Sequence, residues 1–301
     1  MKKNILILLI VVLVPIIALA LAWVKLKMQN KMENKRMEVI LSTKPNMSSL
    51  PGGWDVKTDM ILDDPFDVKV NKLIPHAFVL EDLFSERECD MLIDLFLGSG
   101  ISAPVSIQGR QDIVDDRMGS VRATGWSVHL AEQFWNKLNN ILLSRYMIDT
   151  VATDWWQGFD GNPPRWWHPF GVTPMMRFMK YQTNGQHYSH YDAGYIYPDK
   201  NYRSLMSFVL YLTTNPDSGA TRFIRDGQEH KPVWERNHDD WTRETKPEEV
   251  IASVRPKKGS MLIFDHRLCH DVEKYDGPGD RIIIRGDILY TSYPAYHGVE
   301  N

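Results

Sequence analysis

The sequence predicts a mainly β fold of the α+β class, with a sandwich or barrel of short strands behind amino-terminal helices and a single transmembrane helix ahead of both. Three features of the 301 residues lead to this prediction: an uncharged apolar run at the start, two segments with helical spacing, and a strand-rich second half. Beyond residue 174, short apolar or alternating runs are separated by Gly, Asp, Pro and Asn, which is typical of strands joined by turns. These runs cover residues 176–181, 205–212, 221–224, 260–264 and 281–290.

The uncharged run covers residues 5–24, and about 20 apolar residues are enough to cross a bilayer as a helix. Basic residues flank it on both sides, and Trp23 stands at its far edge, where an interfacial aromatic is common. We therefore predict a transmembrane anchor over residues 1–27 and a single-pass membrane location. A cleaved signal peptide is the alternative, because residues 18–20 and 20–22 both read Ala-Leu-Ala and resemble cleavage sites.

Two signals disagree on the side of the membrane that the folded domain occupies. Basic residues are at least as dense after the apolar run as before it, which favours a cytoplasmic domain. A signal-anchor would export the domain instead, and the glycosylation triplet Asn46-Met47-Ser48 is compatible with export. We expect a lumenal or exported domain, in the endoplasmic reticulum if the cell is eukaryotic, and leave the side of the membrane open.

Composition divides the remaining chain into a linker and one domain. Residues 28–74 are polar, with Pro, Ser and Gly clustered near residue 50, and we predict a stalk with little structure of its own. The domain is predicted to span residues 75–301. Ser85 is a good N-cap for a first helix, because Glu86 and Glu88 follow it and an apolar stripe comes next. A second helix is expected over residues 129–145, where apolar residues recur at helical spacing.

The bulk composition excludes several classes of protein. The net charge is −3 and 24% of residues are charged, so no overall field favours nucleic acid, and we predict no nucleic-acid partner. Two cysteines, Cys89 and Cys269, are too few for a disulfide-stapled scaffold, and their spacing does not suit a thiolate zinc site. The sequence leaves open whether these two form one bridge.

The most informative residues are His190 and Asp192, which follow a predicted strand. Residues two apart in a strand point to one face, so an imidazole and a carboxylate can meet one metal ion. His270 is the preferred third ligand, and His266 is its rival, because both follow the strand at 260–264. Two histidines and one carboxylate on one face of a metal leave other positions open, which is typical of non-haem Fe(II) oxygenases.

A basic residue downstream fits the same chemistry. Arg281 lies eleven positions after His270 and suits the distal carboxylate of a bidentate 2-oxo acid. Arg285 lies four positions further along the same strand and is the second choice. A guanidinium can form two parallel hydrogen bonds to a carboxylate, so either residue is chemically suitable.

Residues 75–292 carry these motifs and resemble the catalytic domain of the prolyl 4-hydroxylase α-subunit class of Fe(II)- and 2-oxoglutarate-dependent dioxygenases. The resemblance rests on the segments Phe78 to Cys89, Arg177 to Tyr181, His190-Tyr-Asp192, Gly219 to Phe223 and Pro256 to Gly259. It implies a double-stranded β-helix (jelly-roll, cupin-like) core with flanking amino-terminal helices. It also implies Fe(II), 2-oxoglutarate as cosubstrate, O2 and ascorbate.

The resemblance assigns a role to each candidate residue. His190, Asp192 and His270 match the iron ligands, and Arg281 and Tyr181 match residues that hold the 2-oxoglutarate C5 carboxylate. No further catalytic side chain is predicted. The sequence departs from the family pattern at Arg281, where collagen-type members carry Lys, and at Ser218, where the family has the first Gly of a Gly-Gly turn. The spacing from His270 to Arg281 is also one residue longer than is usual in the family.

The substrate is less specified than the chemistry. Peptidyl proline is the substrate that the resemblance favours, which makes a peptide or protein the first expected partner besides the membrane. A small molecule, a lipid or another amino-acid side chain is the alternative. A jelly roll that binds metal or ligand without catalysis and a zinc hydrolase with the same ligand types are the remaining interpretations. The sequence leaves the oligomeric state open.

Overall fold

The computed structural model describes the chain except at residues 1–20, 26, 29–30, 32, 36, 43, 66, 105–118, 146–147, 150–165, 196, 198–200, 229, 232–234, 236–242 and 293–301. It divides the chain into two compact units, residues 1–43 and residues 44–301. The functional site lies wholly in the second unit.

In the first unit, the described residues between 21 and 42 are helical. Within the part of the chain that the structure describes, no helix is both long and apolar enough to cross a membrane. Most of the predicted span, residues 5–20, lies outside the described residues. The membrane anchor therefore has no support from the described structure and stays a prediction.

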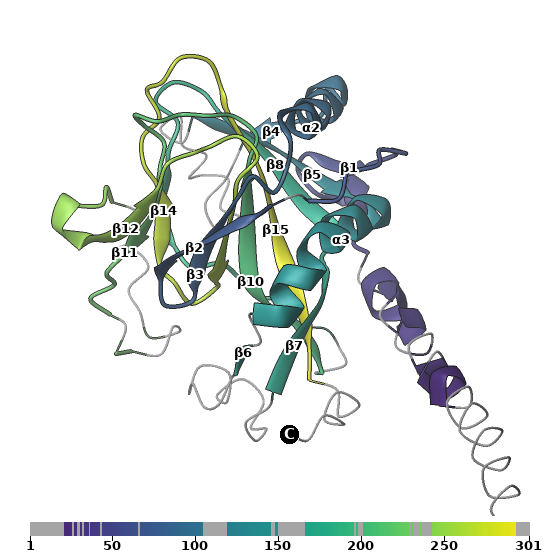
Figure 1. The fold of residues 1–301 in the computed structure, drawn as a ribbon. Coiled ribbons are helices and arrows are strands. Elements are labelled where there is room, and N and C mark those ends of the chain that lie inside the picture. Colours follow the sequence, from purple (N-terminus) through teal and green to yellow (C-terminus); the bar gives the residue numbers. More distant parts are fainter. Residues whose placement is uncertain are drawn as a thin grey trace, which may run out of the picture. The chain divides into compact units, whose positions relative to one another are not determined.

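Two long helices of the second unit begin where the sequence predicts them. Helix α2 spans Glu86–Gly98, and its N-cap Ser85 forms a capping box with Glu88, which satisfies two backbone donors at once. Helix α3 spans Val128–Arg145. Both helices lie on one face of the large sheet, while β11, β12 and β14 lie beyond its other face (Figure 1).

Eight strands form the central framework. The large sheet contains the order β8-β15-β10-β13, and the small sheet has the order β12-β11-β14-β9. Successive strands pass between the two sheets except at β11 and β12, which are neighbours in the small sheet, and every pair within this framework is antiparallel. This order is that of a double-stranded β-helix, as expected from the sequence. The strands are β8 Met175–Tyr181, β9 His187–His190, β10 Tyr202–Tyr211, β11 Thr221–Ile224, β12 Val250–Val254, β13 Met261–Asp265, β14 His270–Val272 and β15 Arg281–Thr291.

Further strands extend the large sheet to eleven. They are β1 Gly53–Asp55, β2 Lys69–Ile74, β3 Ala77–Glu81, β4 Ala103–Pro104, β5 Ser120–Trp126, β6 Ile148–Asp149 and β7 Trp166–Val172; short 3-10 helices cover Met47–Ser49 and Pro247–Glu249. β1 pairs with β5 and β2 pairs with β3. The prediction of a stalk with little structure over residues 28–74 is therefore wrong for the described residues from 28 to 42, which are helical, and for residues 53–55 and 69–74. The backbone groups of the two strands complete the edges of the sheet, a pairing that local polarity does not reveal.

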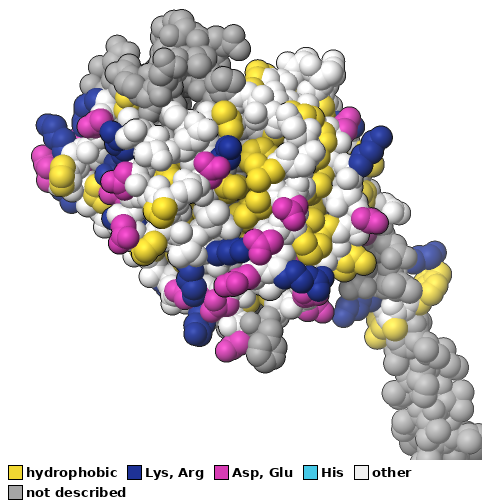
Figure 2. Space-filling view, turned by 90° about the horizontal axis from the view of Figure 1, so that it is seen from above, with side chains coloured by type: hydrophobic (Ala, Val, Ile, Leu, Met, Phe, Trp, Pro, Cys, Tyr) yellow, Lys and Arg dark blue, Asp and Glu magenta, His cyan; other side chains and the backbone are white. Residues whose placement is uncertain are grey.

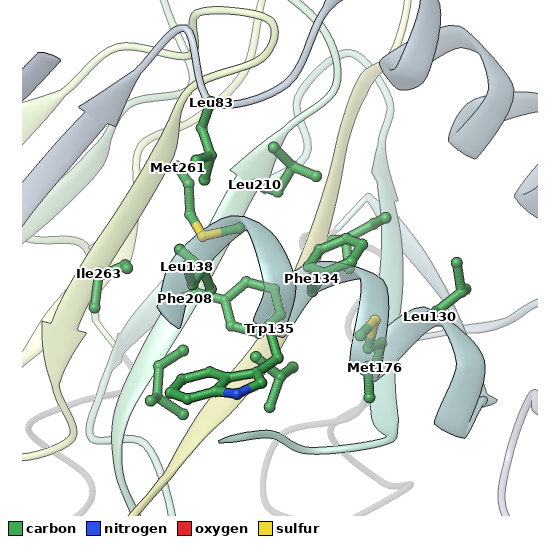
Figure 3. Packing of buried hydrophobic residues seen from close by; sticks show 14 of the residues in the cluster. Leu83, Leu130, Phe134, Trp135, Leu138, Met176, Phe208, Leu210, Met261 and Ile263 are labelled. Atoms are coloured by element: carbon green, nitrogen blue, oxygen red, sulfur yellow. The ribbon is translucent and has the colours of Figure 1, made fainter. Parts of the chain in front are cut away.

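Two apolar cores hold these layers together. One lies under the helices, where Leu130, Phe134 and Leu138 of α3 face sheet residues such as Phe208 and Met176 (Figure 3). The other lies between the two sheets and includes Tyr181, Tyr211, Phe223, Leu262 and Phe264. Alternate residues of β8 and β15 thus point either toward the helices or into the space between the sheets. The second direction leads to the functional site.

Both cysteines are buried, and neither is in a disulfide. The bridge that the sequence left open is therefore absent. Burial raises the pKa of the Cys89 thiol to about 12, so this side chain acts as a small apolar group in the core under α2.

Candidate metal centre

The ends of two neighbouring small-sheet strands bring the predicted ligands together. His190 ends β9, His270 begins β14, and the two residues are direct partners across the strands. Asp192 follows β9 by two residues. Nε2 of His190 lies 3.9 Å from Asp192 Oδ1, and Nε2 of His270 lies 3.7 Å from Asp192 Oδ2. One donor atom from each residue lies within 4.8 Å of the other two, so the three could hold one metal ion.

The backbone fixes the orientation of both imidazoles. Nδ1 of His190 lies 2.7 Å from the carbonyl oxygen of Tyr188, and Nδ1 of His270 lies 2.9 Å from that of Leu268. A carbonyl oxygen accepts, so each ring carries its proton on Nδ1 and leaves the Nε2 lone pair free. This is the usual second-sphere arrangement of a metal-binding histidine.

The charges of the three groups suit a divalent cation. Burial lowers the pKa of His190 and lowers that of His270 to about 3, so both rings are neutral at physiological pH. Burial raises the pKa of Asp192, but Arg285 and the neighbouring histidines outweigh burial and hold it well below its usual range. Two neutral imidazoles and one carboxylate are the donor set of non-haem Fe(II) sites.

Arg285 is engaged with the carboxylate of this cluster. Its Nη2 lies 2.7 Å from Asp192 Oδ1, 3.3 Å from Asp287 Oδ1 and 3.1 Å from the hydroxyl of Ser207. Ser207 in turn donates to Asp192 Oδ2 at 2.5 Å. Both carboxylate oxygens of Asp192 therefore have fixed partners, which hold the group in one orientation. Arg285, the second choice for a cosubstrate anchor, already has carboxylate partners.

Arg281 presents the opposite situation. Its side chain is fully buried, and its Nε and Nη1 have no hydrogen-bond partner in the part of the chain that the structure describes. Its guanidinium lies 4.7 Å from the ring centre of Tyr181 and 5.8 Å from that of Tyr211, and its Nη2 is 3.4 Å from the hydroxyl of Thr221. No carboxylate of the described residues pairs with it. An orphaned buried cation among hydroxyl groups fits the distal carboxylate of a dicarboxylic ligand.

The glycine turn predicted from sequence explains how Arg281 fits. Gly219 has a φ of +70°, a conformation that L side chains rarely adopt. A Cβ at this position would come within 2.9 Å of Arg281 Cδ and 3.1 Å of Tyr275. Glycine is therefore needed both for the turn and for the space that the arginine occupies.

Other histidines and acids near the centre have separate partners. His266, the rival third ligand, is buried with Nε2 3.3 Å from Asp287 Oδ1 and does not belong to the metal-competent group. His187 packs against His190, with 3.0 Å between their Nδ1 atoms. Asp271 accepts two hydrogen bonds from Arg222, at 2.8 and 2.5 Å, so it neither orients His270 nor faces solvent freely.

Sequence reasoning missed several residues of this site. Arg122, Arg177 and Ser207 point into the space between the sheets, and Asp287 joins Arg285 there. Alternation on β8 could have placed Arg177 on the face of Tyr181, because the two are four residues apart. The strand β5, which carries Arg122, has no strong alternation and was not predicted.

Comparison with known families matches the core of the domain. Residues 176–286 match the sequence model of the 2OG-Fe(II) oxygenase superfamily. This segment runs from β8 to β15 and contains all three candidate ligands, Tyr181 and Arg281. The match confirms the resemblance to 2-oxoglutarate oxygenases drawn from the sequence. No curated protein sequence matches the chain.

Solved structures give more distant likenesses. The viral collagen prolyl hydroxylase of Paramecium bursaria Chlorella virus-1 is 14% identical, with a TM-score of 0.38, over 72% of this chain and 96% of that one. A Pseudomonas putida prolyl-4-hydroxylase is 16% identical, with a TM-score of 0.43, over 71% and 92%. HygX of Streptomyces hygroscopicus is 12% identical, with a TM-score of 0.41, over 72% and 82%. Likenesses this distant establish neither the substrate nor the site.

Proposed function

We propose that this chain, which matches the 2OG-Fe(II) oxygenase superfamily over residues 176–286, is an Fe(II)- and 2-oxoglutarate-dependent dioxygenase that hydroxylates a substrate C–H bond. His190, Asp192 and His270 would hold the iron. Arg281, with Tyr181, would bind the C5 carboxylate of 2-oxoglutarate. O2 is the co-reactant, and ascorbate is the reductant that the family resemblance adds.

The single observation that carries this proposal is Arg281, which lies between the two sheets, as the metal-competent cluster does, and has no carboxylate partner among the described residues. Burial of a cation without a carboxylate is costly, so Arg281 is suited to an anionic partner beyond the described residues, such as a bound ligand. The three candidate ligands supply no anion for Arg281, since Asp192 is held by Arg285 and Ser207. A dicarboxylate that reaches from the metal to Arg281 would satisfy both groups.

The residues divide the work between them. When bound, iron and 2-oxoglutarate together supply the oxidising power for C–H hydroxylation. Arg281 and the hydroxyl of Thr221 would orient the cosubstrate, and the rings of Tyr181 and Tyr211 exclude water from the guanidinium. Arg285 and Ser207 keep Asp192 ionised and in place.

A binding experiment on the full chain tests this assignment and separates the two arginines. The protein is loaded with Mn(II), and metal and 2-oxoglutarate affinities are measured by calorimetry. Arg281→Gln should weaken 2-oxoglutarate binding at least about tenfold with little effect on the metal, because it removes a charged hydrogen-bond donor. Arg285→Gln should instead weaken the metal, by about 10- to 100-fold, because it releases a ligand carboxylate.

Turnover is then read as CO2 release from labelled 2-oxoglutarate with Fe(II) and ascorbate. His190→Ala and Asp192→Ala should abolish it. Turnover that survives both substitutions would refute the ligand assignment, and iron binding with no turnover would favour a non-catalytic jelly roll.

Peptidyl proline is the substrate we propose first, on the motifs that resemble prolyl 4-hydroxylases. Incubation with a panel of proline peptides, read by mass spectrometry, should yield a mass gain of one oxygen. Hydroxylation confined to small molecules, lipids or other side chains would keep the chemistry and replace the substrate. The membrane anchor and a lumenal location remain proposals from the sequence, which localisation of a tagged full chain can test.

A further inference from the structure

A row of guanidinium groups lines the inner face of the large sheet. Arg285 of β15 is the direct partner of Arg177 on β8, so two cations lie opposite each other across neighbouring strands. On β5, Arg122 pairs with Met179 and shares the inner face with it, diagonal to Arg177. Like charges opposite one another in a sheet are destabilising, so this arrangement needs anions nearby.

The described carboxylates are too few to balance this row. Arg285 forms ion pairs with Asp192 and Asp287, in which its Nη2 lies 2.7 and 3.3 Å from the respective Oδ1 atoms. Nη1 of Arg177 lies 4.0 Å from Asp287 Oδ2, and Arg285 lies nearer the other oxygen of that carboxylate. The same Nη1 has no hydrogen-bond partner among the described residues. Arg122 has no ion pair among the described residues, and its Nε is buried without a partner. Three guanidinium groups therefore face two carboxylates, and one positive charge, shared by Arg122 and Arg177, remains unbalanced among the described residues.

The electrostatic response agrees with this geometry. Burial and the neighbouring Arg285 lower the pKa of Arg177 to about 10. The same two causes lower the pKa of Arg122. Their surroundings thus destabilise the cationic forms of both arginines, and a bound anion would stabilise those forms.

Basic side chains on the outer surface, unlike those of the inner face, lie close to acidic side chains. On the face shown in Figure 2, basic side chains lie among acidic ones. Lys257 lies 2.9 Å from Glu81 and 3.2 Å from Asp82, and Lys258 lies 2.6 Å from Asp90. The excess of positive charge is therefore a local property of the inner face and does not follow from the composition, whose net charge is −3.

We infer that Arg122 and Arg177 form an anion subsite that binds a carboxylate or phosphate group of the primary substrate beside the metal centre. This inference rests on the proposed function. The cosubstrate already has Arg281 and the metal for its two ends, so it does not supply the missing charge. The side chain of Arg177 is 25% exposed and that of Arg122 is half-buried, so a ligand can reach both.

The subsite restricts the class of substrate. An acidic peptide, a free amino or hydroxy acid, or a phosphorylated molecule would present the required anion. A neutral substrate would leave Arg122 without a carboxylate among the described residues and Arg177 with only its 4.0 Å approach to Asp287. Specificity of this kind is strong, because a site built around a charge rejects the analogue that lacks it.

Calorimetry on the full chain tests the subsite directly. The protein is loaded with Mn(II), saturated with 2-oxoglutarate and titrated with inorganic phosphate in one arm and acetate in the other, at constant ionic strength. We expect at least one of these anions to bind the native chain. Arg122→Gln and Arg177→Gln should each weaken that binding at least about tenfold. The preferred anion indicates whether the substrate carries a phosphate or a carboxylate.

Lys180→Gln is the matched control. Lys180 is on β8 beside Met179 but points to the opposite face, where it lies 3.3 Å from Asp280. Removal of its charge should leave anion binding unchanged. Thermal unfolding and Mn(II) affinity of each variant show that it is folded.

Three results would overturn the inference. They are no anion binding to the loaded chain, anion binding that is unchanged in Arg177→Gln, and a loss of 2-oxoglutarate affinity in that variant, which would assign the pair to the cosubstrate. A failure of the proposed function is visible earlier, as a native chain that takes up neither Mn(II) nor 2-oxoglutarate. In that case, the same titration on the metal-free chain still measures the affinity of Arg122 and Arg177 for the anion.

Discussion

Two buried cations of this domain, Lys137 and Arg281, differ in whether the described chain supplies a carboxylate partner. Lys137 of α3 and Glu88 of α2 lie 2.9 Å apart with side chains 3% and 2% exposed. Lys137 also donates to the carbonyl oxygen of Leu83, and Glu88 accepts from the backbone of Asp63 and Ser85. Arg281 is buried to the same degree, yet no carboxylate of the described chain meets it.

The comparison teaches how to interpret a buried charge. A pair whose hydrogen bonds are satisfied within the chain joins elements of the fold, here two helices and the segment before β2. A buried charge without a partner destabilises the ligand-free protein, and a ligand of opposite charge stabilises the protein by binding to it. Burial alone does not distinguish these two cases, whereas the hydrogen-bond and ion-pair partners of each charge do.

Lys137→Met should have the largest effect. It leaves the carboxylate of Glu88 buried without its cation, which costs about 3–5 kcal/mol. Urea unfolding of the domain measures this loss as a lower midpoint at unchanged slope. The double variant Glu88→Leu/Lys137→Met should recover part of it, and a single variant as stable as the native chain would show that the pair is unimportant.

Arg281→Met should change stability in the opposite direction. It removes an unsatisfied buried cation, so the cosubstrate-free protein should gain about 1–3 kcal/mol, or about 2–4 °C for each kcal/mol. Differential scanning calorimetry without 2-oxoglutarate gives the measurement, and Arg281→Lys, which keeps the charge, is the control. A loss of stability would mean that Arg281 has a structural partner, and the comparison with Lys137 would no longer hold.

The pH dependence of stability should show the smallest effect. Burial raises the pKa of Glu88, but the backbone of Ser85 and the ammonium of Lys137 outweigh it, so the folded-state pKa lies below 4.5. A depressed carboxyl pKa means that the unfolded state binds more protons in this window. The stability difference between the native chain and Glu88→Gln should therefore be constant above about pH 4.5 and shrink as pH falls further. A difference that stays constant down to pH 3 would contradict the shift.

Much of the framework could be predicted from local patterns. Ser85 with Glu88 marks the start of α2, and the spacing of Leu130, Phe134 and Leu138 marks α3, because capping and helical periodicity act over a few residues. His190 and Asp192 were found because a strand places alternate residues on one face. Strands β1, β2 and β5 were missed, since their stability comes from partners distant in sequence.

The sequence by itself determined the ligand types, the helices and the strand-rich core, because each depends on the chemistry or periodicity of neighbouring residues. Only the tertiary structure decided what the arginines do. Arg281 and Arg285 are four residues apart on one face of β15, and nothing local distinguishes them. Among the described residues, Asp192 and Asp287 pair with Arg285 and no carboxylate pairs with Arg281. Charge pairing of this kind is set by residues that folding brings together from separate strands.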